Sequence, residues 1–95
     1  MKLPFAPAVN KINDVCYIVP AKAGSPYRTI IKCDETTAQV VNLLSTNIGE
    51  GRMIEQAALL LPNMTTEEIT IIVRKVRDVI GKHEFKEKVL EVIEI

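Results

Sequence analysis

The fold is decided at Tyr27-Arg-Thr-Ile-Ile-Lys-Cys-Asp-Glu-Thr-Thr-Ala38, where a strand pattern gives way to a helix pattern. From Tyr27 to Cys33 the chain is rich in β-branched and aromatic residues, which favours a strand. Alternate side chains of this strand would form its core face: Tyr27, Thr29, Ile31 and Cys33. Asp34 then fits an N-cap, because its carboxylate can accept hydrogen bonds from the unpaired amides of a first helical turn. We therefore predict a strand that ends at Cys33, followed by a helix.

Upstream of this junction, the sequence predicts an antiparallel hairpin. A second β-branched and aromatic run covers Val15–Val19, and a Pro/Gly/Ser linker at residues 20–26 separates the two runs. A further strand over Ala8–Ile12 would join through the turn-forming pair Asn13-Asp14. The N-terminal part therefore predicts a sheet of two or three antiparallel strands.

Downstream of Asp34, the apolar spacing becomes helical. The first helix should run to about Thr46, and a short second helix should cover Met53–Leu61. A third helix should start at Thr65, because Thr65 and Glu68 fit the capping-box pattern, and end where Gly81 adopts a left-handed conformation. The order of elements is that of an α+β, winged-helix-like domain, with an N-terminal antiparallel sheet followed by three helices.

The C-terminal segment from His83 fits two structures. Phe85, Val89 and Ile93 have helical spacing, whereas Val89–Ile95 is β-branched enough for a strand. Four glutamates of this segment fit a solvated face: Glu84, Glu87, Glu91 and Glu94. We predict a single domain over residues 1–95, with a core at about 8–85 and a C-terminal extension at 86–95.

Composition narrows the classes of function. The 95 residues include 12 basic and 12 acidic side chains, so no net charge attracts nucleic acid or an anionic membrane. No apolar run approaches the roughly 18 residues of a spanning helix, and the N-terminus lacks a signal-peptide pattern. We therefore expect a cytoplasmic protein in which Cys16 and Cys33 stay reduced and pack as small apolar groups.

Residues suited to catalysis or metal binding are few. The single histidine, His83, and the cysteines Cys16 and Cys33 lie in no nucleophile motif. Zinc would need about four nitrogen or sulfur ligands in closely spaced pairs. We therefore predict no catalytic residue, no metal site and no cofactor, and an unrecognised enzyme is the least favoured alternative.

The second and third predicted helices form a helix–turn–helix pair, which raises the question of DNA binding. The expected recognition helix begins with Thr65-Thr-Glu-Glu68 and continues with β-branched residues. Its acidic start would repel phosphate, and its side chains offer little to base edges. Arg74, Lys75 and Arg77 follow, but acidic residues elsewhere balance them. DNA is therefore a less favoured partner than another polypeptide.

Two stretches of this sequence resemble the PqqD family, which comprises pyrroloquinoline-quinone biosynthesis protein D and its relatives, also called RiPP recognition elements. The stretches are Val15-Cys-Tyr-Ile-Val-Pro20 and, after a Gly/Pro loop, Thr29-Ile-Ile-Lys-Cys-Asp-Glu-Thr-Thr-Ala38. Cys33–Ala38 stands in for the usual Leu-Asn-Glu-Thr-Ala at the end of the family's strand. The likeness covers about residues 8–85. The aromatic residue of the family's first helix is absent here, and residues 86–95 lie outside the pattern.

The resemblance implies a non-enzymatic module that binds the leader of a ribosomally made precursor peptide and presents it to a modifying enzyme, commonly a radical-SAM protein. The leader would add as a strand to the exposed edge of the last sheet strand and face the third helix. The expected peptide-binding residues lie on that strand and on one helix flank: Arg28, Thr29, Ile30, Ile31, Lys32, Ile71, Lys75 and Val79. The alternative is a winged-helix structural or regulatory domain that binds a protein partner or, less favoured, DNA.

Overall fold

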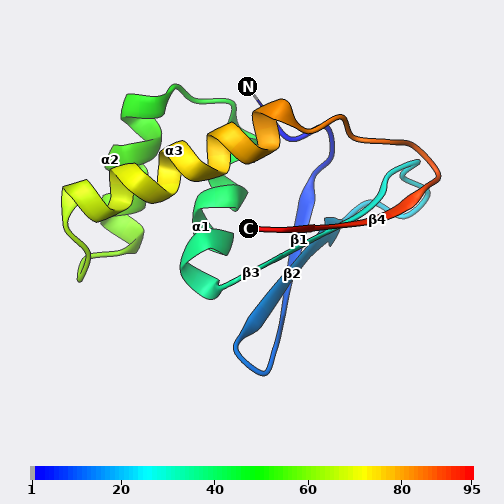
Figure 1. Cartoon of the computed structure of the whole chain (residues 1–95), viewed down its shortest axis with the longest axis horizontal. Coiled ribbons are helices and arrows are strands. Elements are labelled where there is room, and N and C mark those ends of the chain that lie inside the picture. The colour runs from blue at the N-terminus through cyan, green and yellow to red at the C-terminus, as the bar shows by residue number, and fades with distance from the viewer. Residues whose placement is uncertain (1) are drawn as a thin grey trace.

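Residues 2–95 are described by a computed structural model, which contains a four-stranded sheet and three α-helices (Figure 1). The strands, in their order across the sheet, are β1 (Pro7–Ile12), β2 (Val15–Pro20), β3 (Arg28–Cys33) and β4 (Leu90–Glu94). The helices are α1 (Glu35–Leu43), α2 (Glu50–Leu60) and α3 (Thr66–Lys82), and a 3-10 turn over Leu44–Thr46 extends α1. The α+β class is confirmed, with three antiparallel strands before the helices and a fourth strand after them.

The β1–β2 hairpin has the predicted third strand and the predicted turn. Ile12 pairs with Val15, and the two residues between them, Asn13 and Asp14, have positive φ angles of 47° and 65°. Two consecutive residues of this kind form the type I′ turn, whose twist matches that of antiparallel strands. Asn and Asp tolerate this conformation better than most side chains do, which is why the sequence signal was reliable here.

The β3–α1 junction has the predicted cap. Oδ1 of Asp34 accepts a hydrogen bond from the Thr37 amide at 2.7 Å, so the side chain before α1 satisfies an amide of its first turn. On β3, alternate side chains are buried, as the predicted core face requires: Thr29, Ile31 and Cys33. The Tyr27–Ala38 segment therefore directs one row of β3 side chains toward the helices.

The start of α3 is as predicted, but its end is not. The Glu68 amide donates to Oγ1 of Thr65 at 3.2 Å, and the Thr65 amide donates to Oε1 of Glu68 at 3.1 Å, which closes the capping box. Gly81 lies inside the helix, so the predicted left-handed exit is wrong. The chain instead leaves α3 at His83 in an extended conformation, with φ −82° and ψ 131°, which needs no glycine.

The helices lie on one face of the sheet. α1 packs against β1 and β2, while α2 and α3 pack against α1 and against each other (Figure 1). α2 begins at Glu50 rather than at the predicted Met53, because Gly49 has the extended conformation of an N-cap. Within residues 2–95, no helix has both the length and the apolar composition needed to cross a membrane.

The C-terminal segment forms a strand rather than a helix. β4 returns to the sheet after α3 and pairs in parallel with β3 along Arg28–Lys32 (Figure 1). Ile93 of β4 is buried and joins the hydrophobic core, as does Phe5 near the other end of the chain. The hydrophobic core therefore includes residues near both ends of the chain.

Candidate functional site

The edge of β3 that the sequence predicts to be free is already paired. β4 runs alongside Arg28–Lys32, so the expectation of unpaired amides and carbonyls on this edge is wrong. Backbone hydrogen bonds flank the pairing, one from the Lys88 amide to the Pro26 carbonyl at 2.6 Å and one from the Ile95 amide to the Lys32 carbonyl at 3.0 Å. A bare strand edge invites pairing with other chains, and here the chain covers it with its own C-terminal segment.

The five predicted residues of β3 divide between the two faces of the sheet. Thr29 and Ile31 are buried on the helix face, and the other three lie on the outer face, partly or fully exposed: Arg28, Ile30 and Lys32. β4 alternates in register with β3, so Glu91 pairs with Thr29 and Ile93 pairs with Ile31. Any strand in the place of β4 would thus present alternate side chains to a buried face and to the outer face.

On the buried face, three side chains form what we call the Glu91 cluster: Thr29, His83 and Glu91. The Thr29 hydroxyl donates to Oε1 of Glu91 at 2.8 Å. Nε2 of His83 lies 3.3 Å from Oε2 of Glu91, without the alignment of a hydrogen bond. The hydroxyl of Thr29 lowers the pKa of the Glu91 carboxyl, and contacts with His83 and the Lys86 amide act in the same direction. The cluster therefore favours a carboxylate at this position of β4.

The predicted residues of α3 form a row along the helix, and His83 of the Glu91 cluster continues this row. Ile71, Lys75 and Val79 are spaced by four residues, and His83 continues the spacing directly after the helix. Val79 is half-buried against the core, while Ile71 and Lys75 are exposed. The structure thus brings Val79 and Ile31 into one core and leaves Ile71 and Lys75 at the solvent end of the row.

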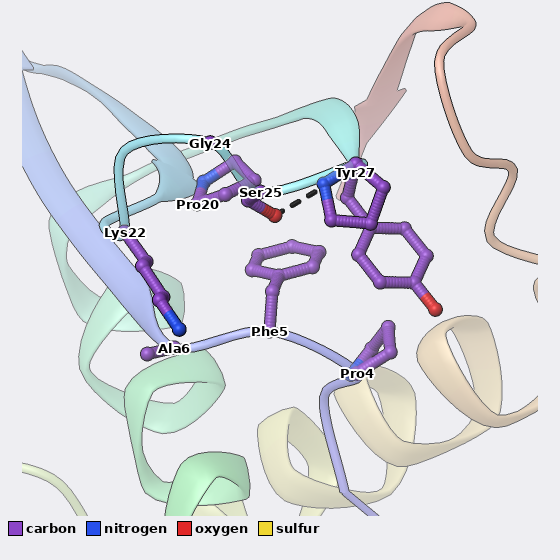
Figure 2. Close-up of a pocket in the computed structure, with 9 residues that line it drawn as sticks. Pro4, Phe5, Ala6, Pro20, Lys22, Gly24, Ser25 and Tyr27 are labelled. Carbon is purple, nitrogen blue, oxygen red and sulfur yellow. Dashed lines mark hydrogen bonds between the residues drawn. The ribbon is translucent and has the colours of Figure 1, made fainter.

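An aromatic cluster holds the start of β3 to the segment that leads into β4. The Phe5 ring lies 5.9 Å from the ring of Tyr27 and 5.8 Å from that of Phe85, which it meets edge-on. The ring of Phe85 in turn lies 4.8 Å from that of His83. Phe5 also lines an open pocket of about 320 Å³ beside the β2–β3 loop, in which it stands between Lys22 and Tyr27 (Figure 2). The walls of this pocket are mostly apolar.

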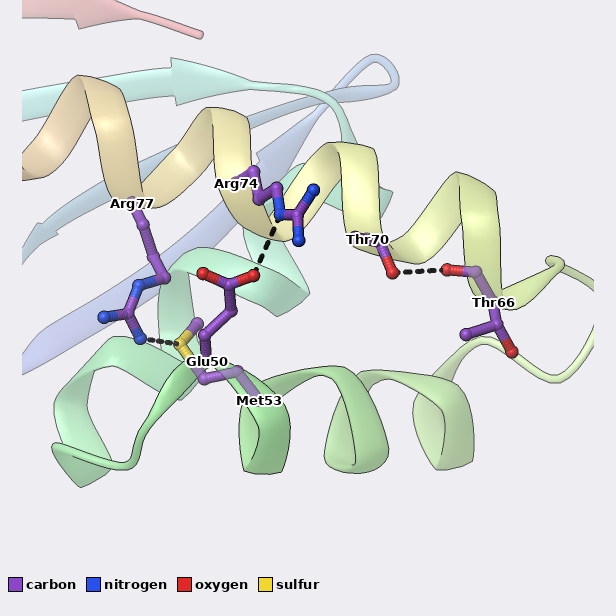
Figure 3. A network of polar contacts seen from close by, with 6 residues as sticks. All are labelled: Glu50, Met53, Thr66, Thr70, Arg74 and Arg77. Carbon is purple, nitrogen blue, oxygen red and sulfur yellow. Dashed lines mark hydrogen bonds and ion pairs between the residues drawn. The ribbon is translucent and has the colours of Figure 1, made fainter.

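The opposite flank of α3 is engaged with α2. Nε of Arg74 donates to Oε1 of Glu50 at 2.9 Å, and Nη1 of Arg77 lies 3.7 Å from Sδ of Met53 (Figure 3). Nearer the start of α3, the Thr70 hydroxyl donates to the carbonyl oxygen one turn earlier (Figure 3). Two of the basic residues that a recognition helix would use for phosphate therefore point toward a neighbouring helix.

The thiols have the surroundings of packing residues. Cys16 and Cys33 are free, buried and paired opposite each other in the β2–β3 register. Burial raises the pKa of the Cys33 thiol to about 11, and the neighbouring Cys16 and Asp34 add to this effect. A thiol of this kind holds almost no thiolate at neutral pH. Across residues 2–95, no three His, Cys, Asp or Glu side chains group as metal ligands would.

Sequence reasoning missed the Glu91 cluster. It placed Glu91 on a solvated face, which is wrong, because only 17% of that side chain is exposed. The β-branched run from Val89 was a usable signal for the strand. Nothing local could signal its partner, because Thr29 and Glu91 are 62 residues apart.

Similarity to known proteins does not assign the chain to a family. The resemblance to the PqqD family depends on the strand–helix junction at Cys33–Ala38 and on the order of the elements around it. No protein-family model matches the chain, and no curated protein or solved structure matches it significantly.

Proposed function

We propose that this protein is a non-enzymatic peptide-binding module, which binds the leader of a ribosomally made precursor peptide by strand addition and presents it to a modifying enzyme such as a radical-SAM maturase. The module would work in the cytoplasm, where precursor peptides are synthesised and where Cys16 and Cys33 would stay reduced. The resemblance to the PqqD family supports the choice of ligand, and the β3 edge supports the mode of binding.

The observation that carries this proposal is that the β3 edge holds an extended strand from a distant part of the chain. β4 follows α3, yet it pairs with β3 over the whole of Arg28–Lys32. This edge is therefore straight enough, and has enough backbone groups directed outward, to hydrogen-bond a strand that is not its neighbour in sequence. Strand addition of a peptide uses the same backbone groups for affinity.

Selectivity would come from the buried face of the added strand. Thr29 and His83 provide a polar position, and Ile31 provides an apolar position two residues further along. His83, which contacts Glu91, follows α3 at the spacing of Ile71, Lys75 and Val79, so this row would offer Lys75 and the apolar Val79 to longer ligands. Backbone pairing with two such positions distinguishes peptides by side-chain pattern without any catalytic group.

The test is a selection of peptides followed by matched substitutions. A displayed library of N-terminal segments from short open reading frames of the host should yield peptides that bind the full-length protein with micromolar Kd. Ile71→Asp should weaken their binding by at least about fivefold, equivalent to about 1 kcal/mol. Leu59→Asp, at a similarly exposed apolar residue on α2, is the control and should leave the Kd unchanged.

Two results would contradict the proposal. One is the failure of any peptide to be enriched over its level on an unrelated domain. The other is equal weakening by Ile71→Asp and Leu59→Asp, which would indicate non-specific contact with apolar surface rather than a site beside α3.

A further inference from the structure

The side-chain pattern of β4, the strand that occupies the β3 edge, indicates which peptides this edge would bind. β4 lies where an added peptide would lie, with two side chains on the buried face and three on the outer face. We propose that β4 is an exchangeable internal copy of the ligand: the β3 edge binds extended acidic–aliphatic segments of the pattern Glu-x-Ile, parallel to β3, once β4 has left. This inference rests on the proposed function, because it names the class of peptide and the regulation of that site.

The acidic position is recognised by groups that remain when β4 leaves. Thr29 belongs to β3 and His83 to the end of α3, and both approach the carboxylate of Glu91, at 2.8 Å and 3.3 Å. With β4 in place Thr29 is fully buried, and its hydroxyl donates to a carboxylate of the strand beside it. A glutamate in an incoming strand, at the register position of Glu91, supplies that acceptor with a charge-assisted bond.

The aliphatic position lies two residues later on the same face. Ile93 is only 8% exposed and pairs with Ile31, which is fully buried in the core. The residue between the two inward positions, Val92, is 59% exposed on the outer face. The β3 edge therefore selects a glutamate and an aliphatic residue two positions apart, and it leaves the residue between them free.

β4 is held more weakly than the two central strands, β2 and β3. It pairs with one neighbour only, in parallel, and most of its surface is open, with Leu90 71% exposed. The segment that leads into it is largely exposed, and Lys88 has a positive φ of 61°, which a side chain disfavours. An edge segment with one buried side chain can open locally while the core between the helices and β1–β3 persists.

Because β4 is tethered, it competes with any added peptide at an effective concentration on the order of millimolar. The apparent Kd of the peptide is its intrinsic Kd divided by the fraction of molecules in which β4 has left. A substitution in β4 that spares β3 and α3 should therefore strengthen the binding of an added peptide.

The experiment uses the full-length protein and a fluorescent synthetic peptide of residues 86–95, Lys-Glu-Lys-Val-Leu-Glu-Val-Ile-Glu-Ile. Ile93→Thr removes the buried anchor of β4 but keeps β-branching, and Val92→Thr is the matched control on the exposed face. By anisotropy, Ile93→Thr should bind the peptide at least about tenfold more tightly than the wild type does, and Val92→Thr should equal the wild type. Equal Kd values for all three proteins, or no binding by any, would overturn the proposal.

The pattern itself is tested by changing the peptide. With the Ile93→Thr protein as receptor, peptides carrying Glu91→Gln or Ile93→Thr should bind at least about tenfold more weakly, whereas Val92→Thr in the peptide should have no effect. Thr29→Val in the receptor should reduce the preference for Glu over Gln, because only His83 then remains beside the carboxylate. If all three changes in the peptide raise its Kd by the same factor, the site does not select the pattern Glu-x-Ile, and the proposal fails.

Hydrogen exchange on the wild-type protein gives a second measurement that does not depend on a variant. The amides of β4 should exchange at least about tenfold faster than those of β2. If the amides of both strands exchange at the same rate, that of global unfolding, the proposal is overturned.

Two combined results separate this inference from the proposed function. If a selected leader binds the wild type and Ile93→Thr with equal Kd while the 86–95 peptide binds neither, strand exchange is contradicted and the proposed function stands. If the 86–95 peptide binds but no leader can be selected, the proposed function is contradicted and strand exchange stands.

Discussion

Replacement of Ile31 by alanine, compared with the same replacement at Ile30, tests the register on which the site depends. Ile31 is fully buried between Ile18 of β2 and Ile93 of β4, whereas Ile30 is only partly buried on the outer face. Ile31→Ala removes three carbon groups, worth about 0.8 kcal/mol each, and leaves a cavity that adds about 1 kcal/mol. The expected loss is about 3.5 kcal/mol, out of the roughly 5–14 kcal/mol usual for a chain of this size. Ile30→Ala should cost only about 1 kcal/mol, because it removes partly hydrated surface.

Urea unfolding followed by circular dichroism measures both losses, and the dependence of the free energy on urea should be unchanged. In thermal unfolding, Tm should fall by roughly 14–28 °C for Ile31→Ala and by roughly 4–8 °C for Ile30→Ala. Equal losses, or a larger loss at Ile30, would refute the register. A slip of one residue exchanges the two faces of a strand, and it would move Thr29 away from the Glu91 cluster.

Three further contacts give expectations of their own. Because the pKa of the Cys33 thiol is raised to about 11, Ellman's reagent at pH 8 should leave this thiol unmodified until urea unfolds the protein; rapid reaction in the native state would contradict its burial. Asp34→Ala removes the acceptor for the Thr37 amide and should lower the free energy of unfolding by about 1 kcal/mol, with a smaller loss for Asp34→Asn; an unchanged urea midpoint would argue against the cap. The Thr29 hydroxyl lowers the pKa of Glu91 from its ordinary 4.5, so the stability that this carboxylate adds is present at neutral pH and is lost as the pH falls through the lowered pKa. In a carbon-13 NMR titration, Thr29→Val should therefore raise the pKa of Glu91, and identical values in the two proteins would exclude the hydroxyl as the cause.

The elements that sequence reasoning predicted well are those whose signals are local. Asp34 caps a helix through an amide three residues away, and the capping box of Thr65 and Glu68 spans the same distance. The turn at Asn13-Asp14 is likewise defined by two neighbouring residues. In each case the interacting residues lie within four positions of one another, so the local sequence pattern was sufficient to predict the cap or the turn.

The parts that were missed depend on contacts between distant segments. The spacing of Phe85, Val89 and Ile93 fits a helix and the β-branched content of Val89–Ile95 fits a strand, and the pairing of this segment with β3 decides for the strand. Gly81 lies inside α3, and the chain leaves the helix only at His83, in an extended conformation. The predicted free edge at Arg28–Lys32 was wrong for the same reason, since parallel pairing across a helical layer has no local sequence signal.

Amide chemical-shift mapping shows whether the β3 edge takes up a peptide strand. The measurement uses full-length ¹⁵N-labelled protein titrated with an unlabelled leader peptide selected as described above. We expect shift changes at Arg28–Lys32 and at the Lys75–Val79 flank of α3, together with loss of the β4 signals from their paired positions. Changes confined to α1 or to the free edge of β1, with Arg28–Lys32 unaffected, would contradict it.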